Sequence, residues 1–133
     1  MWRIVIALVL LAHGIGHSLG LFPAFGLAKT KRWTDHSWLL TNFIGESAAR
    51  WFGVVLWLAA MFGFIGAALG FYGILIPQWR ILAIASAIVS LAGLSLYWNA
   101  FPSLTNKIGA IAVDVIILVA LLWAHWPASE IVP

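Results

Sequence analysis

Two histidines, His13 and His17, stand one helical turn apart in the first long apolar stretch of this 133-residue chain. In an α-helix, side chains four residues apart lie on one face, and Gly16 and Gly20 fall on the same face. Small residues let a neighbouring helix approach closely, which indicates that this face looks into the protein rather than toward lipid. Two imidazoles placed in this way could chelate a metal ion, ligate a haem or hydrogen-bond a polar ligand.

Further polar residues are expected at a similar depth in the other apolar stretches. Asp114 is the only carboxylate deep inside the last of them. An ionisable group inside a membrane span costs on the order of 2.5–3.5 kcal/mol or more, so it marks a functional site by default. We therefore expect one polar pocket, open toward the connection that follows the first stretch. Its candidate ligand-binding residues are His13, His17, Asp114, Glu46, Arg50 and Asn99.

Three chemistries fit such a pocket and stay open. A metal ion could take His13 and His17 as ligands, with Asp114 or Glu46 as a third. A haem could be ligated by a single histidine, whereas a bis-His haem is disfavoured, because two histidines on one helix face cannot be trans axial ligands and His125 lies at another depth. A quinone, a sterol-like lipid or a proton pathway needs the fewest further assumptions. There an imidazole donates to a carbonyl, and Asp114 fixes its tautomer or relays the proton.

Packing alone could also account for these residues. His13 and His17 could hydrogen-bond across helices, and Asp114 could be held by one of them or by Arg50 as a structural ion pair. Glu46 and Arg50 have the spacing of an ordinary pair at a helix start, where the helix dipole favours the acid. One face of the third apolar stretch indicates helix contact: Ser86, Ser90, Gly93 and Tyr97.

The composition decides the environment that must position these residues. Hydrophobic residues make up 64% of the chain and charged residues only 8%, whereas a soluble domain carries about 25% charged residues. The chain is therefore expected to be an integral membrane protein. It has no cysteine, which excludes disulfides, iron–sulfur clusters, thiolate zinc sites and dithiol oxidoreductases. The net charge of +3 is spread over several loops, so nucleic acid is not an expected partner.

The apolar stretches predict an all-α fold, a four-helix transmembrane bundle forming a single domain over residues 1–133. A span needs about 20 apolar residues, and short connections make consecutive helices antiparallel neighbours. Prolines and Ser103 mark the helix ends, because proline cannot continue a helix and serine caps one. The expected spans are 2–22, 46–72, 78–100 and 107–126.

The longer connection between the first two spans carries Trp33, Trp38 and Phe43. We expect it to lie at the membrane interface, as a short amphipathic helix or a re-entrant turn. Lysine and arginine are more frequent on cytoplasmic loops, and five of the seven lie on the side of this connection. Loops one and three are therefore predicted to be cytoplasmic. The five are Lys29, Lys31, Arg32, Arg50 and Lys107, against Arg3 and Arg80 on the other side.

Four short segments resemble a family of small four-span bacterial membrane proteins of unassigned function: residues 13–20, 53–60, 97–100 and 109–118. Members of that family usually carry one histidine and an amide where Asp114 stands, so His13 with His17 and Asp114 are departures. The resemblance implies a four-helix fold in the bacterial inner membrane and supplies no activity. A looser likeness to four-span proteins of the DoxX type, which lie near quinone-linked oxidation, matches no catalytic residue.

Three kinds of function follow from these observations. The first is a membrane protein that binds a quinone, another lipid-like ligand or an ion at a His/Asp pocket. The second is a non-enzymatic accessory or scaffold subunit, in a homo-oligomer or a larger membrane complex, in which the histidines only pack. The third is a membrane enzyme, an isomerase or a quinone-linked oxidoreductase, that uses His and Asp as acid and base.

Overall fold

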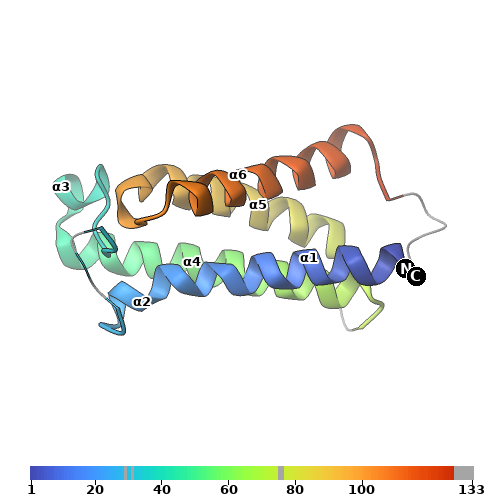
Figure 1. The fold of residues 1–133 in the computed structure, drawn as a ribbon, viewed down its shortest axis with the longest axis horizontal. Coiled ribbons are helices and arrows are strands. Elements are labelled where there is room, and N and C mark those ends of the chain that lie inside the picture. Colours follow the sequence, from blue (N-terminus) through green and yellow to red (C-terminus); the bar gives the residue numbers. More distant parts are fainter. Residues whose placement is uncertain (29, 31, 75–76, 128–133) are drawn as a thin grey trace.

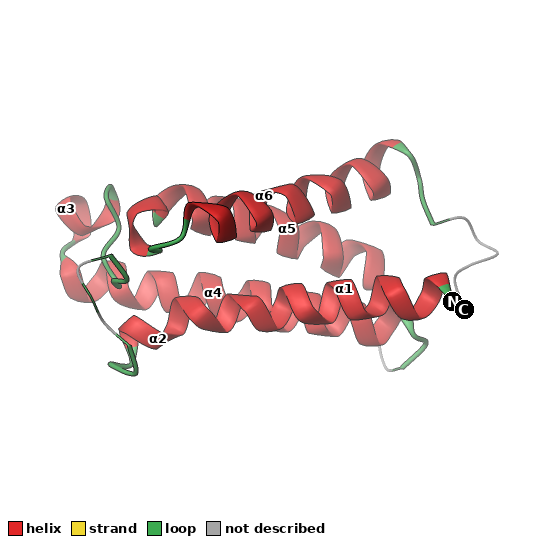
Figure 2. Ribbon diagram, viewed as in Figure 1, coloured by secondary structure: helices red, strands yellow, loops and turns green. Residues whose placement is uncertain are grey.

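Four long apolar helices build the protein, each long and apolar enough to span a membrane. The computed structural model describes residues 1–28, 30, 32–74 and 77–127, and all of its long elements are helical, as Figure 2 shows. The expected all-α bundle is confirmed. Two helix starts, Trp2 and Glu46, coincide with the expected span starts, and the other ends differ from the expected ones by one to four residues. The first span is α1 (Trp2–Gly16), a 3₁₀ turn η1 (His17–Gly20) and α2 (Leu21–Ala24); the others are α4 (Glu46–Phe71), α5 (Trp79–Leu96), and α6 (Leu104–Leu118) with a π turn η3 (Val119–Trp123).

The helices pack as a chain of neighbours in which α4 is central. α1 packs against α4, α4 against α5, and α5 against α6, while α1 and α6 make few contacts with each other. In Figure 1 both of these helices lie in front of α4 and α5. In the apolar part of α4, 44% of the segment is buried inside the protein. The corresponding share is 22% in the first span and 17% in the last. The gap in contacts between α1 and α6 is where the candidate site lies.

Small residues bring α4 and α5 close together. A Cβ added to Gly63 would lie 2.0 Å from Ser86 Oγ, so no larger residue fits there without movement. Ala67 of α4 and Ala83 and Ala87 of α5 are fully buried in the same apolar cluster. In a membrane, helix association depends on such close packing, because lipid tails are as apolar as the side chains. The α4–α5 interface is thus a closely packed part of the bundle. α1 packs against α4, and α6 packs against α5.

The helical path of the first span runs past the proline that was expected to end it. α2 includes Pro23 and ends at Ala24. Proline has no backbone N–H, so the carbonyl four residues earlier, that of Leu19, receives no helical hydrogen bond from it. Trp33 Nε1 donates to this carbonyl at 3.2 Å. The side chain of Trp33 thus bonds the connection after the first span to the carbonyl that proline leaves without its helical donor.

The same connection caps the end of α5. The last carbonyls of a helix lack partners within it; here Ser37 Oγ donates to the Leu96 carbonyl at 2.5 Å and Trp38 Nε1 donates to the Ser95 carbonyl at 2.8 Å. A short helix follows, α3 (Leu40–Ile44), and Gly45 separates it from α4 with a φ of +83°. That backbone conformation strongly favours glycine. The expected short helix is present, and the sequence pattern alone had left a re-entrant turn equally open.

The beginning of α6 follows the predicted pattern. Ser103 is the N-cap, and its side chain accepts a hydrogen bond from the Asn106 backbone N–H at 3.2 Å. Lys107 then reaches back, donating to the Trp98 carbonyl at 2.9 Å and lying 4.5 Å from the centre of the Trp98 ring. These contacts fix where α6 starts, and therefore how far along it Asp114 lies.

Candidate functional site

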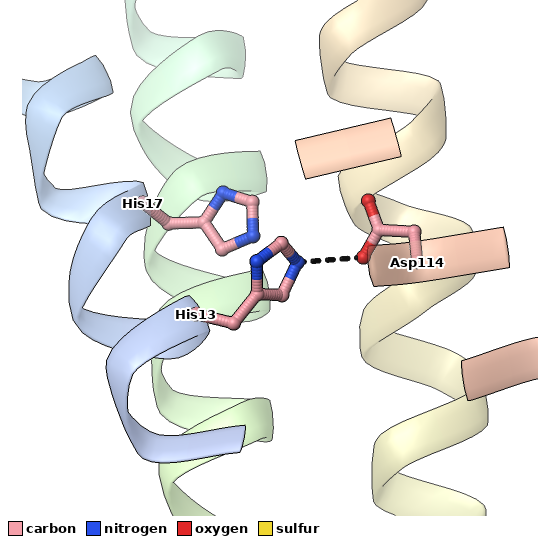
Figure 3. A group of neighbouring side chains, drawn as sticks. All are labelled: His13, His17 and Asp114. Carbon is pink, nitrogen blue, oxygen red and sulfur yellow. Dashed lines mark hydrogen bonds and ion pairs between the residues drawn. The ribbon is translucent and has the colours of Figure 1, made fainter. Parts of the chain in front are cut away.

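Asp114 is completely buried and joins three helices. Its Oδ1 accepts a hydrogen bond from His13 Nε2 of α1 at 2.8 Å, and its Oδ2 accepts one from Ser90 Oγ of α5 at 2.5 Å. Asp114 itself stands on α6 and is 0% exposed. Both carboxylate oxygens thus have a donor, which a buried carboxylate requires. Figure 3 shows the bond from His13 crossing the space between α1 and α6.

His17 lies beside this pair with its ring held on two sides. The imidazole stacks on Phe64 and on Trp57, with interplanar angles of 6° and 14°, and the ring of His13 meets it edge-on at 5.0 Å. His17 is 6% exposed, and among the described residues its Nε2 has no hydrogen-bond partner. A buried polar atom without a partner costs about 1–3 kcal/mol. In Figure 3 the His17 ring points toward His13 and Asp114.

The three side chains form a compact group of nitrogen and oxygen donors. One possible ligand atom from each of His13, His17 and Asp114 lies within 4.8 Å of the other two. Aromatic rings and Ser90 restrict the movement of the group. Such an arrangement can hydrogen-bond a polar ligand, transfer a proton between imidazole and ligand, or hold a metal ion.

A cavity of about 580 Å³ opens beside this group, between α1 and α6. His13 and His17 form part of its wall, and most of the remaining lining is apolar. Gly16 of α1 and Gly109 of α6 face it from opposite sides, and a Cβ added to either would meet nothing within 4 Å. Its other end is polar, at the beginning of α6. That end is lined by Ser103, Thr105, Asn106 and Lys107.

Trp57 of α4 forms part of the cavity wall beside His17. A Cβ added to Gly20 would lie 2.7 Å from Cγ and Cδ1 of the indole, and one added to Gly93 would lie 2.8 Å from its Cζ3. The ring is therefore held between two backbones, one from the first span and one from α5. Its face stacks on His17, so these glycines also fix the position of that imidazole.

The other three candidate residues lie away from this group. Glu46 begins α4 and is exposed; eleven residues separate it from Trp57, which is about 16 Å along a helix. Arg50 Nε donates to Asp35 Oδ2 of the first connection at 2.5 Å. Asn99 lies beyond the end of α5, in the turn η2 (Trp98–Ala100), where its Oδ1 accepts from the Trp38 N–H at 2.9 Å.

Two polar residues of the structure were not singled out as site residues from the sequence. Ser90 was assigned to helix contact, yet its hydroxyl binds the second oxygen of Asp114. The feature of the sequence that could have identified Ser90 is its hydroxyl group in an apolar span on the neighbouring helix. Asp35, in the first connection, is the second of these residues; it is 8% exposed and pairs with Arg50. No pattern in the sequence predicts that this acid folds inward.

Comparison with known proteins defines no family for this chain. No family model, no curated protein and no solved structure matches it. The fold and the site therefore define the class of protein by themselves: a small four-span membrane protein with a buried His/Asp group. Of what the resemblance implied, the structure shows the four helices of membrane-spanning length.

Proposed function

We propose that this protein binds a lipophilic molecule with a polar head group, such as a quinone, in the cavity between α1 and α6. The head group would hydrogen-bond to the imidazoles of His13 and His17, and Asp114 would orient His13 for that contact. The single observation that carries the proposal is the juxtaposition of this polar group with an apolar cavity of about 580 Å³.

The size and lining of the cavity support this reading. Small-molecule sites usually measure roughly 300–1,000 Å³ and combine apolar walls with a few placed polar groups. The few contacts between α1 and α6 also leave a side of the bundle through which a molecule could enter from the bilayer. A cavity of this kind inside a helix bundle is a usual place for a ligand.

The proposal is tested by filling the cavity. Gly109→Leu and Gly16→Leu would each add a bulky side chain at a lining position whose Cβ would meet nothing within 4 Å. The amount of lipophilic molecule extracted by organic solvent from the purified protein is expected to fall about tenfold, which equals about 1.4 kcal/mol of binding free energy. Mass spectrometry of the extract measures it.

The matched control is Val115→Leu, which adds bulk on the same helix at a lipid-facing position. It is expected to retain the wild-type amount of bound molecule. Equal recovery from Gly109→Leu and from the wild type would refute the cavity as the binding site.

We also propose a location, a single membrane domain of residues 1–133 in a bacterial inner membrane, with loops one and three cytoplasmic. Arg32, Arg50 and Lys107 support it against Arg3 and Arg80; Lys29 and Lys31 lie outside the described residues. Because the chain has no cysteine, single cysteines can report the orientation. An impermeant maleimide should label Tyr72→Cys on intact cells and Phe43→Cys only after lysis. The reverse pattern would overturn this orientation.

A further inference from the structure

We propose that His13, His17 and Asp114 form a binding site for one divalent first-row transition-metal ion, with Zn²⁺ as the representative. Such a site goes beyond the binding of a lipophilic molecule and does not depend on it. It rests on the donor set, on an unused nitrogen and on the residues that hold the donors in place.

The donor set suits such an ion. Two imidazoles and one carboxylate are among the ligand sets that bind Zn²⁺, with metal–ligand distances of about 2.0–2.2 Å. Ligand atoms in a tetrahedral site of that size lie about 3.3 Å apart. One atom from each of the three side chains already lies within 4.8 Å of the others. Small rotations of His13 and Asp114 would close the site.

The Nε2 atom of His17 gives the second, independent observation. The residue is 6% exposed, and this nitrogen has no hydrogen-bond partner in the part of the chain that the structure describes. Buried polar atoms in proteins nearly always have one. If His17 served only in packing, this nitrogen would be expected to hydrogen-bond to a neighbouring backbone group or side chain. A metal ion between His17 and the pair of His13 and Asp114 would supply the missing partner.

The surroundings hold the donors as metal sites require. Ser90 Oγ donates to the Asp114 oxygen that His13 does not use, which fixes the carboxylate. Phe64 and Trp57 fix the plane of the His17 ring. Such outer contacts orient ligands, and changing one typically weakens metal binding 10–100-fold. Ser90 is thus a positioning residue of the proposed site.

Three protein ligands leave a coordination position free. Because His13 and His17 also line the cavity, that position would face the cavity, as in zinc sites that bind a water or a substrate. A divalent ion with one carboxylate carries a net charge of +1 in a low-dielectric interior. The ion would therefore favour an anionic oxygen donor as fourth ligand.

The test is metal binding by the full chain, purified in mild detergent with an affinity tag that contains no histidine. Calorimetric titration with Zn²⁺ should give one equivalent bound per chain, and Co²⁺ should give the visible absorption of a four-coordinate site. Asp114→Asn, which keeps the side-chain shape, and His17→Gln should each weaken binding about 100-fold or more. Ser90→Ala should weaken it about tenfold and leave the shape of the Co²⁺ spectrum unchanged.

Two control variants distinguish this metal site from adventitious metal binding and from the lipophilic ligand. His125→Gln removes a histidine at the far end of the bundle and should bind Zn²⁺ like the wild type. Gly109→Leu fills the cavity and should keep the metal while losing any lipophilic molecule, so the two proposals can fail separately. A wild-type chain without stoichiometric Zn²⁺ or Co²⁺ binding, or undiminished binding by Asp114→Asn, would overturn the metal site.

Discussion

The variant Asp114→Ala is expected to loosen the bundle where α1 meets α6. It removes the acceptor for both His13 Nε2 and Ser90 Oγ, and helix-to-helix hydrogen bonds in membranes contribute about 0.6–1.7 kcal/mol each. The free energy of unfolding should therefore fall by about 1–3 kcal/mol. Unfolding by sodium dodecyl sulfate in mixed micelles measures it.

The loosening in Asp114→Ala should be located between α1 and α6, because these two helices make few other contacts with each other. This can be measured as well. Spin labels on Ile4→Cys and Leu122→Cys, both exposed and at the same end of the bundle, report the distance between the two helices. The distance should lengthen and broaden in Asp114→Ala. Asp114→Asn is the control, since its amide oxygen can still accept a hydrogen bond from one of these side chains and its NH₂ group can donate to the other, either to Ser90 Oγ or to a neutral His13 Nε2. An Asp114→Ala protein with wild-type stability and an unchanged distance would contradict the role of this network.

The variants Gly20→Ala and Gly93→Ala are expected to be the most damaging single-methyl additions at the site. Each new Cβ would lie within 2.8 Å of the Trp57 ring, which lies between the two backbones. Overpacking of this kind costs about 1–3 kcal/mol. The same unfolding measurement applies. Gly16→Ala and Gly109→Ala, whose Cβ atoms would meet nothing, should match or slightly exceed wild-type stability.

A Trp57→Phe background should separate the two glycines. The Cβ at Gly93 would meet the six-membered ring of the indole, at Cζ3 and Cη2, whereas the Cβ at Gly20 would meet Cγ and Cδ1. Phenylalanine lacks the outer ring and keeps an atom at each of the inner positions. The cost of Gly93→Ala should therefore shrink in this background while that of Gly20→Ala persists. Equal relief of both variants would show that the ring is not wedged as described.

The four-helix architecture could be predicted from composition and length, because continuous apolar stretches of about 20 residues in a chain with 8% charged residues satisfy their backbone in a bilayer as helices. Helix ends were less predictable. Pro23 was expected to end the first span, but the helical path continues to Ala24, and Trp33 donates to the Leu19 carbonyl that proline leaves without its helical donor. Span three was expected to reach residue 100, whereas α5 ends at Leu96, where Ser37 and Trp38 cap its carbonyls. These contacts come from a distant connection, which no local pattern reveals.

Depth along the spans predicted which ionisable residues lie close together. His13, His17 and Asp114 were expected to share a leaflet, and the structure places them in contact or close to it. The depth of a residue does not predict which way its side chain turns at a helix end. Two candidate residues at helix ends therefore lie away from the group. Arg50 lies on the side of Asp35, and Asn99 lies in a turn that binds Trp38.

The glycines of the first span show a further limit of pattern reasoning. Gly16 and Gly20 share a face and were both expected to let a helix approach. Gly20 lies against Trp57, but Gly16 faces the open cavity, and the close approach to α4 is made at Gly14. A spacing of four predicts which residues share a face. It cannot predict where a neighbouring helix is absent, and here that absence creates the cavity.

Native mass spectrometry of the gently extracted protein, wild type beside Gly109→Leu, is the sharpest test of whether the cavity holds a lipophilic ligand. We expect a chain that carries an additional lipophilic mass in the wild type and loses it in the variant. Fragmentation of the complex would then weigh the molecule for identification. A bare wild-type monomer would contradict ligand binding in the cavity. So would a complex with another protein that carries no lipophilic molecule, and it would favour an accessory subunit whose histidines only pack.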